Sequence, residues 1–131
     1  MTKYRQTIFG EPNGNCFATG VASILDLSEI PDLPGGGNWW SKFVRWCRER
    51  ELEPLWHEDS PEVRKFISEG YKGHYLVSGM GPRGLQHVVV GHEGKFVHDP
   101  HPSDKFLVTT TGYLFILQKE EAEVWLAEGS S

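Results

Sequence analysis

The first half of the chain places its apolar residues at helical spacing. From position 16 to position 25 they follow i, i+4, i+7 and i+8, one face of a helix: Phe17, Val21, Ile24 and Leu25. Asn15 stands where a side chain can cap the first turn, and Ala18 and Ala22 keep the adjoining flank small. We therefore expect a deeply buried helix that begins at Cys16.

Two further helices are indicated before residue 71. In residues 38–51 an apolar stripe marks one helical face: Trp40, Phe43, Val44 and Cys47. Trp40 is expected to pack in the core, the usual role of an aromatic side chain in such a stripe. In residues 60–70, Ser60 can cap the first turn, Pro61 suits the first helical position, and Gly70 can end the helix.

The second half of the chain changes to β-rich segments. Runs of β-branched and aromatic residues, broken by Gly and Pro, occupy residues 74–79, 86–92, 95–99 and 112–119. Residues 93–95 indicate a hairpin turn between two of these runs, and residues 4–9 alternate as a short edge strand would. Helices followed by strands predict an α+β fold, with an N-terminal buried helix packed on an antiparallel β-sheet.

Length, charge and cysteine content narrow the class of protein. The chain has 131 residues, so we expect a single domain over residues 1–131. A net charge of -5 without any run of Lys and Arg disfavours a nucleic acid or an anionic membrane as partner. The two cysteines make no disulfide framework, and no segment has the apolar length of a signal peptide or a membrane span. These features predict a cytoplasmic protein with reduced thiols, and they leave its oligomeric state open.

Cys16 is the first candidate for chemistry. A thiol at the start of a helix meets the positive end of the helix dipole, which favours the thiolate that attacks carbonyl carbons. The alternative is a small buried residue at the start of a core helix, because free cysteine is among the most buried residue types.

His87 and Asp99 are candidates for a base and for the residue that orients it. His87 opens an apolar run, where a titratable side chain costs free energy unless it has a partner. Asp99 follows beyond the turn at residues 91–95, so an antiparallel hairpin would bring it next to His87. A carboxylate there fixes the imidazole tautomer and stabilises its charged form. Taken singly, His87 also fits a hydrogen-bonded strand end, and Asp99 an Asp-Pro turn.

Together these residues resemble the papain-like cysteine peptidase superfamily. The resemblance rests on the segments "GNCFATGVASIL" and "HDPHPS", with His87 between them at a strand start. The chain is similar in particular to the branch with the bacteriocin-leader processing peptidases, and to small papain-like phage and bacterial proteins. The similar region is residues 6–103. The resemblance implies a compact papain-like fold with Cys16 as nucleophile, His87 as base and Asp99 as orienting residue.

The resemblance also implies a side-chain amide that stabilises the oxyanion. Papain-like enzymes usually carry a Gln a short way before the Cys, at the position that is Gly10 here. We expect Gln6 to replace it, with Asn13 and Asn15 as alternatives that equally fit a turn or a helix cap. The backbone N–H of Cys16 would be the second donor, because it lies in the first helical turn.

Residues beside two Gly-rich segments are expected to line the substrate cleft. Together with Asn15 they are Trp39, Ser78, Gly79 and Arg83. Glycines in residues 78–84 would let a substrate backbone approach closely. Arg83 suits a carboxylate or a phosphate, and equally a solvated loop.

These features leave three classes of function. The first is a thiol-dependent acyl-transfer enzyme, such as a cysteine peptidase or amidase, acting on a peptide, isopeptide or amide substrate without a cofactor. The second is a catalytically silent papain-like binding module, for instance a phage protein acting on a host factor. The third is a metal-dependent hydrolase that uses residues between His92 and His101. His98 and Asp99 would point to opposite faces of a strand, so no metal is expected, and the complete Cys-His-Asp set favours the first class.

Overall fold

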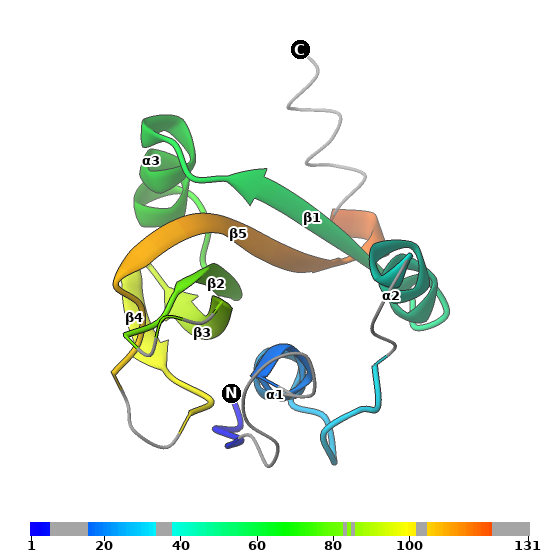
Figure 1. The fold of residues 1–131 in the computed structure, drawn as a ribbon. Helices are drawn as coiled ribbons and strands as arrows, with labels where there is room; N and C mark the ends of the chain where they lie inside the picture. The colour runs from blue at the N-terminus through cyan, green and yellow to red at the C-terminus, as the bar shows by residue number, and fades with distance from the viewer. Residues whose placement is uncertain (6–15, 34–37, 83, 85, 102–104, 122–131) are drawn as a thin grey trace. The chain divides into compact units, whose positions relative to one another are not determined.

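The computed structural model describes residues 1–5, 16–33, 38–82, 84, 86–101 and 105–121. It confirms an α+β fold with a five-stranded antiparallel sheet (Figure 1). The elements are α1 (Cys16–Leu25), α2 (Trp39–Arg48), β1 (Leu52–Glu58), α3 (Pro61–Glu69), β2 (His74–Met80), β3 (Gln86–His92), β4 (Lys95–His98) and β5 (Thr109–Gln118). Among the described residues, no helix has both the length and the apolar character to cross a membrane.

The strands lie in the order β1-β5-β2-β3-β4. The predicted hairpin is confirmed: β3 and β4 pair antiparallel across the turn at Glu93 and Gly94. Both turn residues have positive φ, 51° and 85°, as a two-residue type I′ turn requires. A register shift between Val90 and Gly91 interrupts this ladder, so the end of β4 is displaced by one residue relative to β3.

The chain forms two compact units. The first consists of residues 1–32 and 56–114, and it contains all of α1, α3, β2, β3 and β4. The second consists of residues 33–55 and 115–131, and it contains α2. The expectation of a single domain over residues 1–131 stays a prediction.

In the first unit, α1 and α3 lie on opposite sides of the β2–β3 pair (Figure 1). Gly20 of α1 lies against the side chain of Leu76, whereas Tyr71, just after α3, packs its ring against Tyr75. Leu76 and Tyr75 are consecutive residues of β2, so their side chains point to opposite faces of the sheet. A two-sided cover explains why β2 and β3 are mostly buried.

The deeply buried α1 is confirmed, but its most buried side differs from the predicted stripe. Phe17, Ile24 and Leu25 are only half-buried. The buried residues are Ala18, Thr19, Gly20, Val21, Ala22 and Ser23. Small side chains let the helix backbone approach the sheet closely, and a Cβ on Gly20 would lie 2.8 Å from Leu76 Cδ2.

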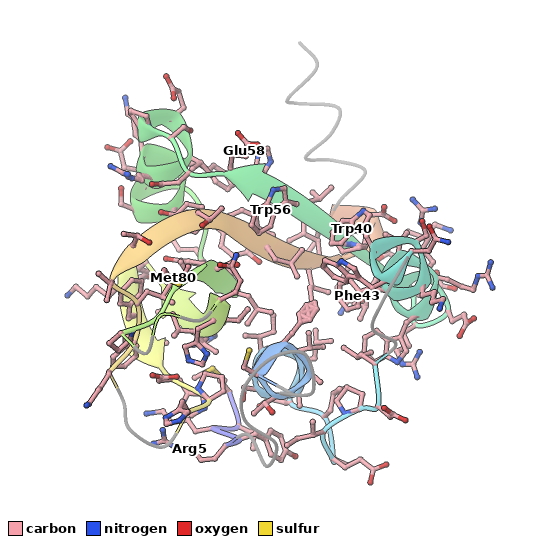
Figure 2. All side chains as sticks on the ribbon, viewed as in Figure 1. Arg5, Trp40, Phe43, Trp56, Glu58 and Met80 are labelled. Atoms are coloured by element: carbon pink, nitrogen blue, oxygen red, sulfur yellow. The ribbon has the colours of Figure 1, made fainter. Side chains whose placement is uncertain are left out.

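The other helices follow their sequence signals. Ser60 accepts a hydrogen bond from the Val63 N–H, and Pro61 starts α3 as predicted, with Gly70 at its end. In α2, Phe43 is buried as expected, but Trp40 is exposed, which makes its predicted core role wrong (Figure 2). α2 has only two buried residues, so its buried stripe is too narrow to include Trp40.

One strand was not predicted, and one predicted strand needs correction. β1 is absent from the predicted β-rich runs, and its Pro54 is tolerated because β1 is an edge strand. Tyr4 and Arg5 belong to no strand, and the remainder of the predicted edge strand, residues 6–9, lies outside the described residues.

Candidate active site

Cys16 is the first residue of α1 and carries a half-buried free thiol. It lies one helical turn before Gly20, so the two positions share a face of the helix. Gly20 lies against Val88 of β3. Val88 directly follows His87, and Cys16 is one of the groups that raise the pKa of that histidine. The close approach of α1 to β3 therefore brings the thiol to the imidazole.

His87 is buried near the start of β3, with 3% of its side chain exposed. Its Nε2 lies 2.6 Å from Asp99 Oδ1, which leaves Nδ1 as the ring nitrogen for Cys16. On its own, burial would lower the pKa of His87, but the hydrogen bonds and negative charges of Asp99 and Cys16 outweigh it. They raise the pKa to about 9, so the ring is charged at neutral pH and Nε2–H donates to Asp99.

Asp99 directly follows β4 and is fully buried. Three donors converge on its carboxylate: Oδ1 accepts from the His87 ring and, at 2.9 Å, from the His101 N–H, and Oδ2 accepts from the Phe106 N–H at 2.9 Å. Burial alone would raise the pKa of Asp99, but these bonds and the charge of His87 lower it below its ordinary value. The carboxylate is therefore held as an anion next to His87.

One of these donors has a strained backbone. Phe106 has a φ of 58°, a conformation that a bulky residue rarely adopts. The same residue directs its N–H to Asp99 Oδ2 and stacks its ring on Phe96 with centroids 5.7 Å apart. Backbone strain of this kind costs about 1–3 kcal/mol and persists only where the surroundings enforce it.

The structure brings His87 and Asp99 into hydrogen-bonding contact, and Cys16 acts on the pKa of the same ring. All three residues belong to the first unit. The arrangement can hold a proton between sulfur and nitrogen while the carboxylate keeps the ring oriented.

Ser78 and Gly79 lie inside β2, within the β-rich run predicted at residues 74–79. Gly79 pairs with His87 across the β2–β3 ladder. A Cβ on Gly79 would lie 1.9 Å from the carbonyl oxygen of Thr109, so the glycine accommodates β5. The space beside Gly79, where we expected a substrate backbone to approach, is thus filled by β5 of the protein itself.

The remaining predicted site residues are Gln6, Asn15, Arg83 and Trp39. Gln6, Asn15 and Arg83 lie outside the described residues, as does Asn13. Trp39 is exposed and belongs to the second unit, where its ring packs edge-on against Trp40. The oxyanion and cleft roles of these residues stay predictions.

The neighbouring histidines have other partners. His98 Nε2 donates to the Tyr4 carbonyl, and burial holds the pKa of His98 below its ordinary value. His92 stacks on His74 with ring centroids 4.5 Å apart. Within the part of the chain that the structure describes, no three His, Cys, Asp or Glu side chains are grouped as metal ligands would be.

Sequence reasoning missed Arg5 and Phe106. Phe106 reaches Asp99 through its backbone N–H, and Arg5 Nη1 reaches the Asp99 carbonyl at 2.7 Å. Neither contact has a sequence signal, because every residue except proline has a backbone N–H and every residue has a carbonyl. Only the "DP" dipeptide hinted that the chain turns back at Asp99.

Comparisons of the chain with protein families, with curated proteins and with solved structures found no match.

Proposed function

We propose that this chain is a thiol-dependent acyl-transfer enzyme with a papain-like fold, acting on a peptide, isopeptide or amide carbonyl. The observation that carries the proposal is the buried, hydrogen-bonded pair of His87 and Asp99, with the half-buried Cys16 thiol acting on the pKa of the same ring. A buried, charged imidazole costs free energy unless it has partners. A sulfur at one ring nitrogen and a carboxylate at the other are the partners that a general acid–base in acyl transfer uses.

In the first half-reaction, Cys16 Sγ attacks the carbonyl carbon as the thiolate, with its proton held on His87 Nδ1. The carbonyl becomes a tetrahedral oxyanion, which the first-turn N–H of Cys16 and the side chain of Gln6 stabilise. His87 then gives its proton to the leaving nitrogen, the C–N bond breaks, and an amine departs. The acyl group stays on Cys16 as a thioester.

In the second half-reaction, neutral His87 takes a proton from water or from an acceptor amine. The resulting nucleophile attacks the thioester, and the C–S bond breaks to give a carboxylic acid or a new amide. The sulfur leaves as the thiolate and the proton remains on His87, which restores the starting pair. Asp99 keeps Nε2 occupied throughout, so Nδ1 always faces the sulfur.

The test is to trap the acyl-enzyme with an activated ester such as p-nitrophenyl acetate, by stopped-flow detection of nitrophenolate and peptide mapping of the acylated residue. We expect a burst of about one equivalent on Cys16. His87→Gln should slow the burst by about 100-fold or more, the usual contribution of a positioned acid–base. Cys47→Ser is the matched control, because Cys47 is buried in the second unit, and its burst should equal that of the wild type.

A burst that persists in Cys16→Ala would refute the proposal. So would acylation of Cys16 at the same rate in His87→Gln as in the wild type. Either result would favour the second class of function, a catalytically silent binding module.

A further inference from the structure

The N-terminal segment, residues 1–5, links α1 to the end of β4. The Tyr4 N–H donates to Ser23 Oγ at 3.1 Å, and the Tyr4 hydroxyl donates to the Leu27 carbonyl. On the other side, His98 Nε2 donates to the Tyr4 carbonyl. The segment therefore fixes the last residue of β4 to the helix that carries Cys16.

Arg5 extends this link to the residue that orients His87. Its Nη1 donates to the Asp99 carbonyl at 2.7 Å and to the His101 carbonyl at 3.2 Å. Figure 2 shows Arg5 reaching from the N-terminal segment toward the chain that follows β4. Hydrogen bonds from a guanidinium are charge-assisted, so they restrain the two carbonyls more strongly than a neutral donor would.

The two carbonyls flank Pro100, in the part of the chain that shapes the Asp99 carboxylate site. The His101 N–H, one of the three donors to that carboxylate, belongs to the same short turn. Holding both carbonyls fixes the direction of the Asp99 side chain and of the donor that meets it. Because the Oδ1–Nε2 distance is 2.6 Å, a small rotation of this turn would break the contact with His87.

Loss of the Arg5 charge and movement of Asp99 would shift the pKa of His87 in opposite directions. Removal of a nearby positive charge favours the charged ring and raises its pKa, whereas removal of the Asp99 carboxylate from Nε2 lowers it. The Arg5 charge acts on His98 in this way and helps to lower its pKa. A fall in the pKa of His87 on loss of Arg5 would therefore report movement of Asp99.

We propose that Arg5 is a positioning residue of the candidate active site: it holds the Asp99–His101 turn so that the Asp99 carboxylate stays on His87 Nε2. The proposal rests on the proposed function, since this geometry serves catalysis only if His87 serves Cys16. Arg5 is exposed, so its bonds contribute little to overall stability, and its loss should leave the fold intact.

The experiment follows the ring resonances of His87 by NMR over a pH titration, with the signal assigned by its loss in His87→Gln. In the wild type the midpoint should lie at about 9. Arg5→Met, which keeps the aliphatic stem and removes the donors, should move the midpoint down by one unit or more, toward the ordinary value of about 6.5. Arg5→Lys keeps one cationic donor, so its His87 midpoint should lie between those of the wild type and Arg5→Met.

Arg64→Met is the matched control. Arg64 is an equally exposed arginine of the first unit whose guanidinium pairs with Asp59 in a bidentate contact, and its loss should leave the His87 midpoint unchanged. If Arg5→Met does not fold, as judged by circular dichroism, His98→Leu and His98→Gln test the same link. The first removes the donor to Tyr4 and should lower the midpoint, and the second keeps a donor and should preserve it.

A folded Arg5→Met protein with the wild-type midpoint would overturn the positioning role, and so would an equal shift in Arg64→Met. These results are distinct from failure of the proposed function. That failure would appear in the wild type itself, as a His87 midpoint near 6.5 together with no acylation of Cys16.

Discussion

Among the described residues, Asp99 meets only hydrogen-bond donors, and these keep its carboxylate charged. Its two oxygens accept from the His87 ring and from the N–H groups of His101 and Phe106, so protonation of the carboxyl would break at least one bond. Cys16, His87 and Asp99 could be named from the sequence because each has a local signal: a helix start, a strand start and a turn. The other two donors to Asp99, the N–H groups of His101 and Phe106, are backbone groups that no residue type indicates.

Asp99→Asn should lower the pKa of His87 from about 9 by about 1–3 units, because the ring loses the opposite charge on Nε2. The midpoint of the His87 ring resonance in an NMR titration measures this shift. Asp59→Asn is the control, since Asp59 pairs with Arg64 and Tyr113 instead. An unchanged His87 midpoint in Asp99→Asn would mean that Asp99 does not hold the charged ring.

At the scale of elements, short sequence signals were sufficient to predict the regular helices and turns. They did not predict the irregular features of the sheet. The capped α3 and the hairpin of β3 and β4 were predictable because Ser60 and the Glu93–Gly94 turn act within a few residues. β1 was missed because Pro54 argues against a strand unless the strand is known to be an edge. The register shift between Val90 and Gly91 was also out of reach, since alternation carries no mark of an extra residue.

Two glycines that lie against side chains should respond differently to a methyl group. A Cβ on Gly91 would lie 2.4 Å from the ring of Tyr75, which is fully buried and cannot move aside. Gly91→Ala should therefore destabilise the protein by about 1–3 kcal/mol, as overpacking does. A Cβ on Gly20 meets only the flexible end of Leu76, and alanine favours the helix by about 1 kcal/mol.

Urea denaturation of both variants checks this contrast. Gly20→Ala should remain within about 1 kcal/mol of the wild type, because the strain at Leu76 and the gain in helix propensity oppose each other. If Gly91→Ala proved as stable as Gly20→Ala, the packing of Tyr75 against β3 would be wrong.

At the scale of the whole molecule, the sequence predicted the α+β class but not the division into two units. The class follows from a change of apolar period along the chain. The division depends on which distant segments meet: residues 1–32 join residues 56–114, and residues 33–55 join residues 115–131. No local pattern encodes such long-range association.

The pH dependence of stability should carry the signature of His87. Its pKa is about 9 in the folded protein and about 6.5 when unfolded, so its contribution is complete below pH 6.5 and is lost as the pH rises through 9. For Asp99, whose folded pKa lies below its ordinary value, the contribution is present above that value and is lost on acidification.

Urea denaturation of the wild type and of His87→Gln at pH 6 and at pH 9.5 isolates the His87 contribution. The difference in unfolding free energy between the two proteins should shrink by a few kcal/mol, on the order of 2–3, between these pH values. A difference that stayed constant or grew with pH would show that the folded protein does not favour the charged ring.

The most direct test of the central claim is the rate of iodoacetamide alkylation of Cys16 at neutral pH, followed by mass spectrometry in the wild type and in His87→Gln. Cys47 serves as the internal control: it is buried, and burial, with the Glu53 charge, raises its pKa to about 12. The same Cys16 in urea-unfolded chain supplies the rate of an ordinary thiol. We expect folded wild-type Cys16 to react faster than this reference, His87→Gln to lose the advantage, and Cys47 to stay inert in both proteins. A Cys16 that reacts no faster than in the unfolded chain, or equally fast without His87, would contradict the account.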